Sequence, residues 1–328
     1  MKQNKKNPLV TIIILTFNNR DIIGTCLDSI KKLHYKNYEC FVIDDNSHDG
    51  TDIYIRKHYP FVTLVKKKES SGIAKSRNIG INYAKGKYIL FLDSDVILKK
   101  AHLDEQVKLM ERDINIAICG SKLLSIYNPK VLDQAGSNYY KIGIGIDQGL
   151  GENASSYNKK KDVFFVGGAA QFVRSNIFKS IGNYDEATDP YGCDDVDICW
   201  RARLFGYKVV YNPLAVGYHA RSTTVRKIGS DYIMYHQKKS HIRMLIKNFG
   251  VINLFLFLPL AFFFSIVGII IFNENRMSKV KAWVWNMKNL PITFNERKKV
   301  QKLRKVNDKE INKYFSKLDS KVFINKIK

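Results

Sequence analysis

A chain of 328 residues is long enough to bury at least one sizeable hydrophobic core, and its 45% hydrophobic and 26% charged content is ordinary for a globular protein. Its five cysteines are odd in number and lack Cys-x-x-Cys spacing, which argues against a disulfide framework or a zinc site and for a reducing compartment. The net charge of +24 is concentrated in residues 221–328, with 23 Lys and Arg against 6 Asp and Glu. Such a basic end suits nucleic acid, an anionic membrane surface or an acidic polymer.

Apolar runs alternate with helix-like segments along the first two thirds of the chain. The first run, residues 9–17, leads into polar residues without a small-residue cleavage site, so we interpret it as a strand and not as a secretory signal. Alternation of this kind indicates βαβ units and a parallel sheet. The expected strands are 10–17, 38–43, 61–65, 88–93, 114–119 and 208–211. The expected helices are 21–33 (capped by Asp21), 52–59, 72–84 (with Ile73, Ile79 and Tyr83 inward), 101–112 and one that opens at Asp194.

The sequence from Tyr88 to Val96 runs five large apolar residues into two carboxylates, Asp93 and Asp95. Side chains alternate along a strand, so both carboxylates leave its end in the same direction. Open α/β sheets bind ligands at that edge, and paired hard oxygen ligands suit Mg²⁺ or Mn²⁺. The alternative is an Asp-Ser-Asp turn in which Asp95 caps a helix.

The first strand is not followed by G-x-G-x-x-G, and the chain contains no G-x-x-x-x-G-K-[ST]. Neither a dinucleotide fingerprint nor a P-loop is therefore supported. Phosphate handling on this scaffold would have to come from a metal ion and from cationic side chains.

Three further features admit a functional and a structural interpretation. Asp194, Asp195 and Asp197 open a helix, where they interact favourably with its dipole or where one serves as a general base. His219 is expected in a loop, where a lone histidine is more often structural than a ligand. Residues 167–169 (Gly-Gly-Ala) permit either close approach of a ligand or a tight bend. Residues 121–162 are expected to form loops and short hairpins, as a flap over the site.

Together these pieces resemble the inverting glycosyltransferases of family 2, which have an A-type glycosyltransferase fold. The resemblance covers residues 8–225, and its later blocks look most like the rhamnosyltransferase-like branch. It depends on five blocks in the expected order: Val10–Asn18, Val42–Thr51, Gly72–Gly80, Phe91–Asp95, and Cys193–Asp197 with the later His219. Leu15, Phe17 and Asp194 stand where Pro, Tyr and Glu are more common.

The resemblance implies a role for each matching residue. Asp195 would be the catalytic base, and Asp95, Asp93 and His219 would hold the metal. Thr16 would sit under the nucleotide base, Asp45 would bind the base or ribose, and Arg77 the base or diphosphate. The residues expected to bind the nucleotide sugar are Thr16, Phe17, Asn18, Asp45, Arg77, Asp93, Gly168, Ala169 and Asp194.

Residues 251–272 form an uncharged apolar stretch that as a helix would extend about 33 Å, enough to cross the hydrocarbon core of a membrane. The alternative is a buried core helix. Both flanks are basic, with Arg243 and Lys247 on one side, so we favour a re-entrant or interfacial segment broken at Pro259 over a single span. Trp283 and Trp285 lie near this stretch and suit an anionic interface.

We therefore expect an α/β protein with a mainly parallel nucleotide-binding sheet of the glycosyltransferase A type. Residues 1–225 would be the catalytic domain, and residues 226–328 a membrane-associated helical region with a basic tail. The expected enzyme uses Mn²⁺ or Mg²⁺ to move a sugar from a dTDP-, UDP- or GDP-linked donor to a lipid-linked glycan or surface polysaccharide. It would act at the cytoplasmic side of the cell membrane, bound to anionic lipid through residues 243–328.

Two other functions share part of this pattern. A basic nucleic-acid-binding protein would explain the charge but not the carboxylate pair, and no nucleic-acid-binding motif stands out, so no nucleic acid is expected as a partner. A sugar nucleotidyltransferase would share the fold and the metal. The basic tail could also serve homo-oligomerisation.

Overall fold

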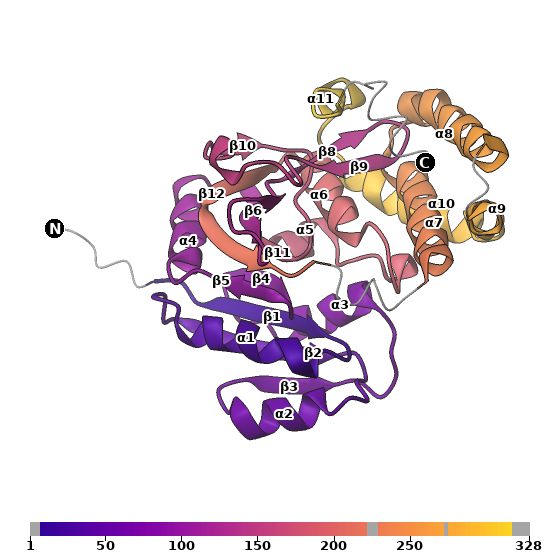
Figure 1. The fold of residues 1–328 in the computed structure, drawn as a ribbon. Helices are drawn as coiled ribbons and strands as arrows, with labels where there is room; N and C mark the ends of the chain where they lie inside the picture. The colour runs from indigo at the N-terminus through magenta and orange to yellow at the C-terminus, as the bar shows by residue number, and fades with distance from the viewer. Residues whose placement is uncertain (1–6, 222–228, 272–274, 317–328) are drawn as a thin grey trace.

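The computed structural model describes residues 7–221, 229–271 and 275–316. A central sheet runs through the molecule with helices on both faces (Figure 1). Its strands follow the order β10-β12-β6-β11-β4-β1-β2-β3, while β5 pairs with β12 and β7 with β6. The pairs β3-β2-β1-β4 and β6-β12 are parallel and β11 is antiparallel to both neighbours, so the expected mainly parallel A-type sheet is confirmed.

The element bounds agree with the sequence expectation to within a few residues up to residue 112, whereas the strand expected at 114–119 runs from Ile116 to Ser125. The strands are β1 (Val10–Thr16), β2 (Tyr38–Asp44), β3 (Thr63–Lys66), β4 (Tyr88–Asp93), β5 (Val96–Leu98), β6 (Ile116–Ser125), β7 (Leu132–Gln134), β8 (Ser137–Tyr140), β9 (Ile144–Asp147), β10 (Lys161–Asp162), β11 (Ala170–Arg174) and β12 (Lys208–His219). The helices among the described residues up to 221 are α1 (Arg20–Lys31), α2 (Thr51–His58), α3 (Ile73–Tyr83), α4 (His102–Arg112), the 3₁₀ turn η1 (Ala154–Ser156), α5 (Ile177–Ile181), the 3₁₀ turn η2 (Glu186–Thr188) and α6 (Asp194–Leu204).

Alternation along the buried strands divides the core into two layers. In β1, Ile12 and Ile14 pack on one face with α1, α2 and α4, while Ile13 packs on the other with α3, α5 and α6. Both layers are mainly apolar, which is why β1 and β4 appear in the sequence as nearly continuous apolar runs. The second layer is organised around Trp200, which is fully buried against aromatic rings.

Three local expectations were wrong. Asn19, not Asp21, is the N-cap residue of α1, and no side chain there makes a capping hydrogen bond. Helix α3 buries its small and polar residues, whereas Tyr83 is 48% exposed, because this helix faces the functional site and not only the apolar core. β12 extends far past residue 211 and includes His219, which therefore ends a strand instead of lying in a loop.

The residues described after 229 form five helices, and all of them except the helix Arg276–Lys288 contribute to the main hydrophobic cluster of the sheet domain. They are α7 (Ser230–Asn248), α8 (Val251–Ile271), α9 (Arg276–Lys288), α10 (Leu290–Leu303) and α11 (Asp308–Asn312). Phe249, Val300 and Phe315 belong to the same hydrophobic cluster as Trp200. The division into residues 1–225 and 226–328 stays a prediction, since its boundary lies outside the described residues, but the two parts share a core.

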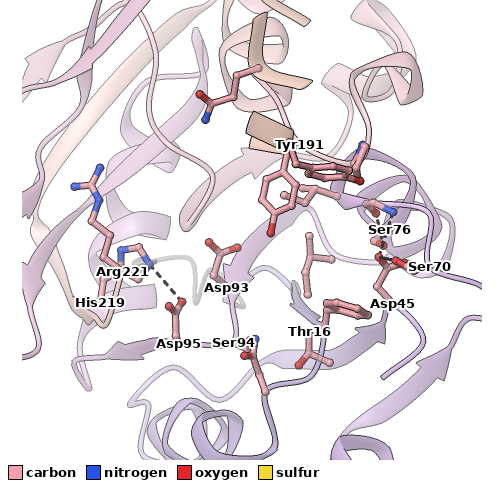
Figure 2. A pocket seen from close by; sticks show the side chains of 18 residues that line it. Thr16, Asp45, Ser70, Ser76, Asp93, Ser94, Asp95, Tyr191, His219 and Arg221 are labelled. Carbon is pink, nitrogen blue, oxygen red and sulfur yellow. Dashed lines mark hydrogen bonds and ion pairs between the residues drawn. The ribbon is translucent and has the colours of Figure 1, made fainter. Parts of the chain in front are cut away.

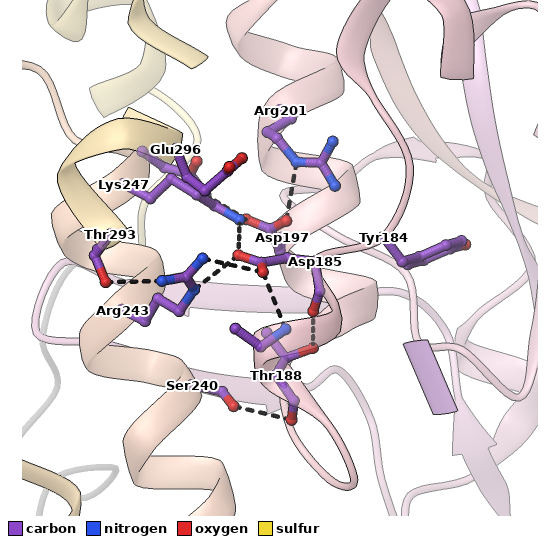
Figure 3. Close-up of polar contacts among 12 residues, drawn as sticks. Tyr184, Asp185, Thr188, Asp197, Arg201, Ser240, Arg243, Lys247, Thr293 and Glu296 are labelled. Atoms are coloured by element: carbon purple, nitrogen blue, oxygen red, sulfur yellow. Dashed lines mark hydrogen bonds and ion pairs between the residues drawn. The ribbon is translucent and has the colours of Figure 1, made fainter. Parts of the chain in front are cut away.

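A buried ionic network joins α7 to η2 and α6 in the sheet domain (Figure 3). Arg243 Nε lies 2.9 Å from Asp185 Oδ2, and Lys247 Nζ lies 2.6 Å from the same oxygen and 2.9 Å from Asp197 Oδ1. Arg201 Nε completes the network at 2.9 Å from Asp197 Oδ2. The expectation that Arg243 and Lys247 face a membrane was wrong, because both are at most 3% exposed and are neutralised within the protein.

Helix α8 is continuous from Val251 to Ile271, with Pro259 inside it, so the expected break at Pro259 was wrong. Among the described residues it is the one helix long and apolar enough to cross a membrane, with a mean hydropathy of 2.8. Only 17% of its most apolar window is buried, which is too little for the core helix that the sequence left as an alternative.

Candidate active site

A cavity of about 680 Å³ opens at the carboxyl ends of β1, β2 and β4, the edge at which open α/β sheets bind ligands. Asp93, Asp95 and His219 lie on one side of it and Asp45 on the other, with Thr16 and Tyr191 between them (Figure 2). The lining residues are Leu15, Thr16, Phe17, Asn19, Asp45, Ser70, Gly72, Ile73, Ser76, Asp93, Ser94, Asp95, Pro190, Tyr191, His219, Arg221, Tyr232 and Gln237.

Strand pairing brings the predicted metal ligands together. β4 ends at Asp93, and Asp95 lies in the turn before β5. β5 pairs with the end of β12, where His219 stands opposite Val96, and the Ala220 N–H donates to the Asp95 carbonyl at 3.1 Å. One donor atom from each of Asp93, Asp95 and His219 lies within 4.8 Å of the other two. This oxygen and imidazole donor set fits a divalent cation such as Mn²⁺ or Mg²⁺.

The charges of these three groups are strongly coupled. Burial and the neighbouring Asp95 carboxylate raise the pKa of Asp93. Burial lowers the pKa of His219, but hydrogen bonds with Asp133 and Asp95 outweigh burial and raise it to about 10. The imidazole therefore carries a proton at neutral pH, and a divalent cation bound by these residues would displace that proton.

Metal binding is accordingly expected to release about one proton at pH 7.5, since a ligating histidine must be neutral. Titration of Mn²⁺ by calorimetry in two buffers of different ionisation enthalpy measures this release. His219→Gln should abolish the buffer dependence, while the surface variant His34→Gln should retain it. Equal enthalpies in both buffers for the wild type would contradict the assignment of His219 as a ligand.

Asp133, which the sequence analysis did not single out, holds His219 in place. Its Oδ2 lies 2.8 Å from His219 Nδ1, which leaves Nε2 facing Asp95 Oδ1 at 3.3 Å. Arg221 Nη1 lies 3.2 Å from the other Asp133 oxygen, and Arg221 Nη2 lies 2.6 Å from Asp147. A carboxylate behind a ligating imidazole fixes its orientation and tautomer. Residues 133 and 219 are too distant in sequence for their pattern to reveal this contact.

The opposite side of the cavity is formed by the ends of β1 and β2. Thr16, Phe17 and Asp45 line it, and their contact with a nucleotide sugar stays a prediction, whereas Asn18 is not among the lining residues and Asn19 is. The Asn18 N–H donates to Ser47 Oγ at 2.9 Å, so Asn18 joins two loops.

Asp45 holds the loop that precedes α3. Its carboxylate accepts hydrogen bonds from Ser70 Oγ at 2.8 Å and from the N–H groups of Ser71 and Gly72 at 3.0 and 3.2 Å. Lys67 forms an ion pair with the same carboxylate. Burial, which raises the pKa of Asp45, is outweighed by these partners, so the net pKa is lowered and the group is a carboxylate at neutral pH.

The other predicted residues form a buried cluster beside the cavity, outside its lining. Arg77 is 3% exposed, pairs with Asp194 and donates from Nη2 to the Gly168 carbonyl at 3.2 Å. A Cβ at Gly168 would lie 2.2 Å from Arg77 Nη2, so a side chain at this position would collide with the buried guanidinium. The contact of Arg77 with a base or diphosphate stays a prediction.

Asp195 belongs to the same cluster. Its Oδ2 accepts from the Gly168 N–H at 3.0 Å and its Oδ1 from the Val196 N–H at 2.8 Å. Burial and the adjacent Asp194 raise the pKa of Asp195 to about 7. A carboxylate with such a pKa is suited to accept a proton near neutral pH. Ala169, whose carbonyl accepts the Asp93 N–H at 2.9 Å, links this cluster to the metal ligands.

Asp189 and Tyr191, which the sequence analysis also missed, lie where the segment before α6 meets the cavity. Asp189 accepts from the Ala74 and Lys75 N–H groups at 2.7 and 2.9 Å, which satisfies the start of α3. Burial raises the pKa of Asp189 to about 7. Tyr191 lines the cavity between Asp45 and Asp93 (Figure 2).

Comparison with known proteins agrees with this geometry. The chain is 33% identical over 122 residues to the putative teichuronic acid biosynthesis glycosyltransferase TuaG of Bacillus subtilis, covering 36% of this chain and 48% of that protein. It is 36% identical over 106 residues to the UDP-Glc:alpha-D-GlcNAc-diphosphoundecaprenol beta-1,3-glucosyltransferase WfaP of Escherichia coli, covering 32% and 42%. The chain thus matches about half the length of these curated relatives.

A solved structure has the same fold. The mannosyltransferase PcManGT from Pyrobaculum calidifontis, in complex with GDP-Man and Mn²⁺, superposes with a TM-score of 0.55 at 19% identity over 87% of this chain and 76% of that one. The rhamnosyltransferase-like branch stays a prediction. The profile of glycosyl transferase family 2 matches residues 11–182, more than half of the chain, including Asp93 and Asp95 at the sheet edge, so the chain belongs to that family.

Proposed function

We propose that this chain is a metal-dependent inverting glycosyltransferase. It moves a sugar from a nucleotide-diphosphate donor to a lipid-linked glycan or a surface polysaccharide. The observation that carries the proposal is the convergence of Asp93, Asp95 and His219 at the carboxyl edge of the sheet, on one side of a cavity of about 680 Å³. Such a cavity has the size of a ligand pocket.

Asp95, His219 and Asp93 would hold the metal ion, and Asp133 would keep the imidazole oriented. The ion would act as a Lewis acid toward the diphosphate that leaves the sugar. Thr16, Phe17, Asp45 and Tyr191 line the remaining length of the cavity and would bind the nucleoside. Among these residues, Asp45 is ionised at neutral pH. It also accepts hydrogen bonds from residues 70–72, so a nucleotide bound to Asp45 would contact the loop that leads into α3.

Asp195 would accept the proton of the acceptor hydroxyl on the face of the sugar opposite the leaving group. Attack from that side inverts the anomeric centre. The two N–H groups that hold its oxygens fix its position, and its pKa near 7 supports the role of a general base. Arg77, paired with Asp194, would stabilise negative charge beside this base.

The acceptor class follows from relatives with named acceptors. The WfaP title names a diphosphoundecaprenol-linked acceptor, and the TuaG title names teichuronic acid biosynthesis. An acceptor carried on a lipid or a cell-surface polymer is consistent with the exposed apolar helix α8. We propose that the enzyme works at the cytoplasmic side of the cell membrane, where nucleotide sugars are made. Homo-oligomerisation through the basic tail is a second possible role for that segment.

The test is a donor screen by calorimetry with nucleoside diphosphates and their sugars, with and without Mn²⁺. Metal-dependent binding of one nucleotide is expected, with its loss in Asp95→Ala, because that carboxylate is an expected ligand. The matched control is Asp113→Ala, a surface carboxylate paired with Lys208 at 2.8 Å. If no nucleotide binds with or without metal, the proposal fails. If the chain instead joins a nucleoside triphosphate to a sugar phosphate and releases pyrophosphate, it is a sugar nucleotidyltransferase.

A further inference from the structure

One side of helix α8 packs along its length against the rest of the protein. Near its start, Asn253 Nδ2 donates to Asn312 Oδ1 at 2.9 Å. Ala261, at its middle, is 4% exposed and belongs to the main hydrophobic cluster. Toward its end, Ser265 Oγ accepts from Trp283 Nε1 at 2.9 Å, and the Gly268 carbonyl accepts from Lys279 Nζ at 3.2 Å.

The opposite side of α8 is apolar and exposed. Phe255, Phe263 and Ile270 are 75%, 58% and 68% exposed, and their spacing of seven or eight residues keeps them on one helix face. Single exposed apolar residues need no explanation, but a continuous face marks an interaction surface. The exposed apolar residues of α8 are Val251, Ile252, Phe255, Leu256, Leu260, Phe262, Phe263, Ile266, Ile270 and Ile271.

Helix α9 carries a second apolar stripe. Met277, Val280, Val284 and Met287 are between 41% and 71% exposed and recur with helical spacing, while Ser278, Ala282 and Asn286 face inward. Leu290, Ile292 and Phe294 continue the exposed apolar surface into α10. In Figure 1, α8 and α9 lie at the outer edge of the molecule, with α7 and α10 between them and the sheet.

Contacts between α9 and α7 show that α8 does not cross a bilayer in this arrangement of the helices. Ser278 Oγ donates to Asp231 Oδ1 of α7 at 3.1 Å, and Asn286 Nδ2 donates to the Lys239 carbonyl of α7 at 3.0 Å. If α8 crossed, α9 would lie on the far side of the membrane from α7, and all of these contacts would break. The ring of Trp283 also packs on Phe262 of α8, with centroids 4.8 Å apart.

We propose that α8 and α9 form one monotopic surface that docks in the plane of a single leaflet of an anionic bilayer, and that α8 does not cross it. This inference rests on the membrane part of the proposed function. The lipid is anionic because residues 273–328 carry 16 Lys and Arg against 5 Asp and Glu, and Lys281 and Lys288 are exposed on α9 itself.

Docking in this orientation keeps the active site close to the membrane. Tyr232 and Gln237 of α7 line the cavity, and Ile242 and Ile246 of the same helix belong to the cluster against which Leu254 and Leu258 of α8 pack. One rigid helix thus connects the donor cavity with the docked surface. An acceptor whose lipid stays in the same leaflet could reach the site without leaving the membrane.

The first test is flotation of the purified full chain with vesicles of phosphatidylcholine, with and without phosphatidylglycerol. Phe263→Glu on α8 and Met287→Glu on α9 are each expected to weaken binding to anionic vesicles by about tenfold or more, because a carboxylate is costly in hydrocarbon. Ile53→Glu on α2, at a site 69% exposed and far from α8 in Figure 1, is the matched control. If Met287→Glu binds anionic vesicles as well as the wild type does, α9 is not part of the docking surface and the proposal fails. It also fails if the wild type is a dimer in solution and Met287→Glu is a monomer with unchanged flotation, because the apolar face would then be a dimer interface.

The second test is topology in right-side-out and inverted membrane vesicles. Lys281→Cys on α9 and Lys108→Cys on α4 are both exposed positions, and a membrane-impermeant maleimide should label both from the same side. The wild type supplies the background of the native cysteines, four of which are buried. Labelling from opposite sides would show a span and refute the proposal. Nucleotide binding by these variants is measured separately, so a failed glycosyltransferase assignment leaves the docking result readable.

Discussion

Asp195→Asn is expected to lower turnover by about 10²–10⁴-fold, the usual contribution of a positioned general base, while the affinity for the nucleotide donor stays near the wild-type value. The amide is similar in size to the carboxylate but has a single acceptor oxygen, so it can keep only one of the two hydrogen bonds that the Gly168 and Val196 N–H groups donate to separate carboxylate oxygens. The variant also loses the ability to accept a proton, and this loss is what lowers turnover. Comparison of single-turnover rates with calorimetric donor affinity separates the two effects, and a variant with wild-type turnover would remove Asp195 from the mechanism.

The role of Asp195 as a general base also predicts how the reaction rate depends on pH. A base acts only when deprotonated, so with the pKa of Asp195 raised to about 7, kcat/KM should rise with pH up to about 7 and level off above it. The control is Asp189→Asn, because burial raises the pKa of Asp189 to about 7 as well, yet its carboxylate accepts N–H groups at the start of α3. The acid limb should persist in Asp189→Asn and disappear from the residual activity of Asp195→Asn. The reverse result would assign the limb to Asp189.

The sequence was sufficient to predict those parts of the structure that depend on local pattern. Continuous apolar runs identified β1 and β4, and the paired carboxylates after β4 identified one side of the cavity. Those inferences succeeded because burial on both faces and the period of a strand are properties of neighbouring residues. The family resemblance added His219, although the strand that carries it was expected to end eight residues earlier.

What the sequence missed depends on contacts between distant residues. Lysine and arginine near an apolar stretch suggested a membrane-facing flank, yet Arg243 and Lys247 meet Asp185 and Asp197, some fifty to sixty positions earlier. The inward position expected for Tyr83 of α3 was wrong for the same reason, because α3 buries residues with distant partners, such as Asn78, which bonds with the backbone of Tyr184. No periodicity in either segment specifies its partner.

The buried network of Figure 3 leads to the largest expected effect on stability. Asp185→Ala should lower the free energy of unfolding by about 3–5 kcal/mol, because Arg243 loses its carboxylate and Lys247 loses one of two while both stay buried. The control is Asp28→Ala, whose pair with Lys31 at 3.9 Å is about half exposed and should contribute less than about 1 kcal/mol. Urea unfolding of both variants measures the difference, and equal midpoints would contradict the role given to the network.

Acid should weaken the same network. Burial alone would raise the pKa of Asp185, but Lys247 and Arg243 outweigh burial and hold it well below its ordinary value. A carboxyl whose pKa is depressed by folding stabilises the native state at pH values above its unfolded pKa of about 4, and this contribution is lost as the pH falls further. The wild type should therefore lose stability more steeply below about pH 4 than Asp185→Ala does. The network joins α7 to α6, the helix that carries Asp195. Parallel slopes for the two proteins would mean that Asp185 does not contribute to the loss of stability in acid.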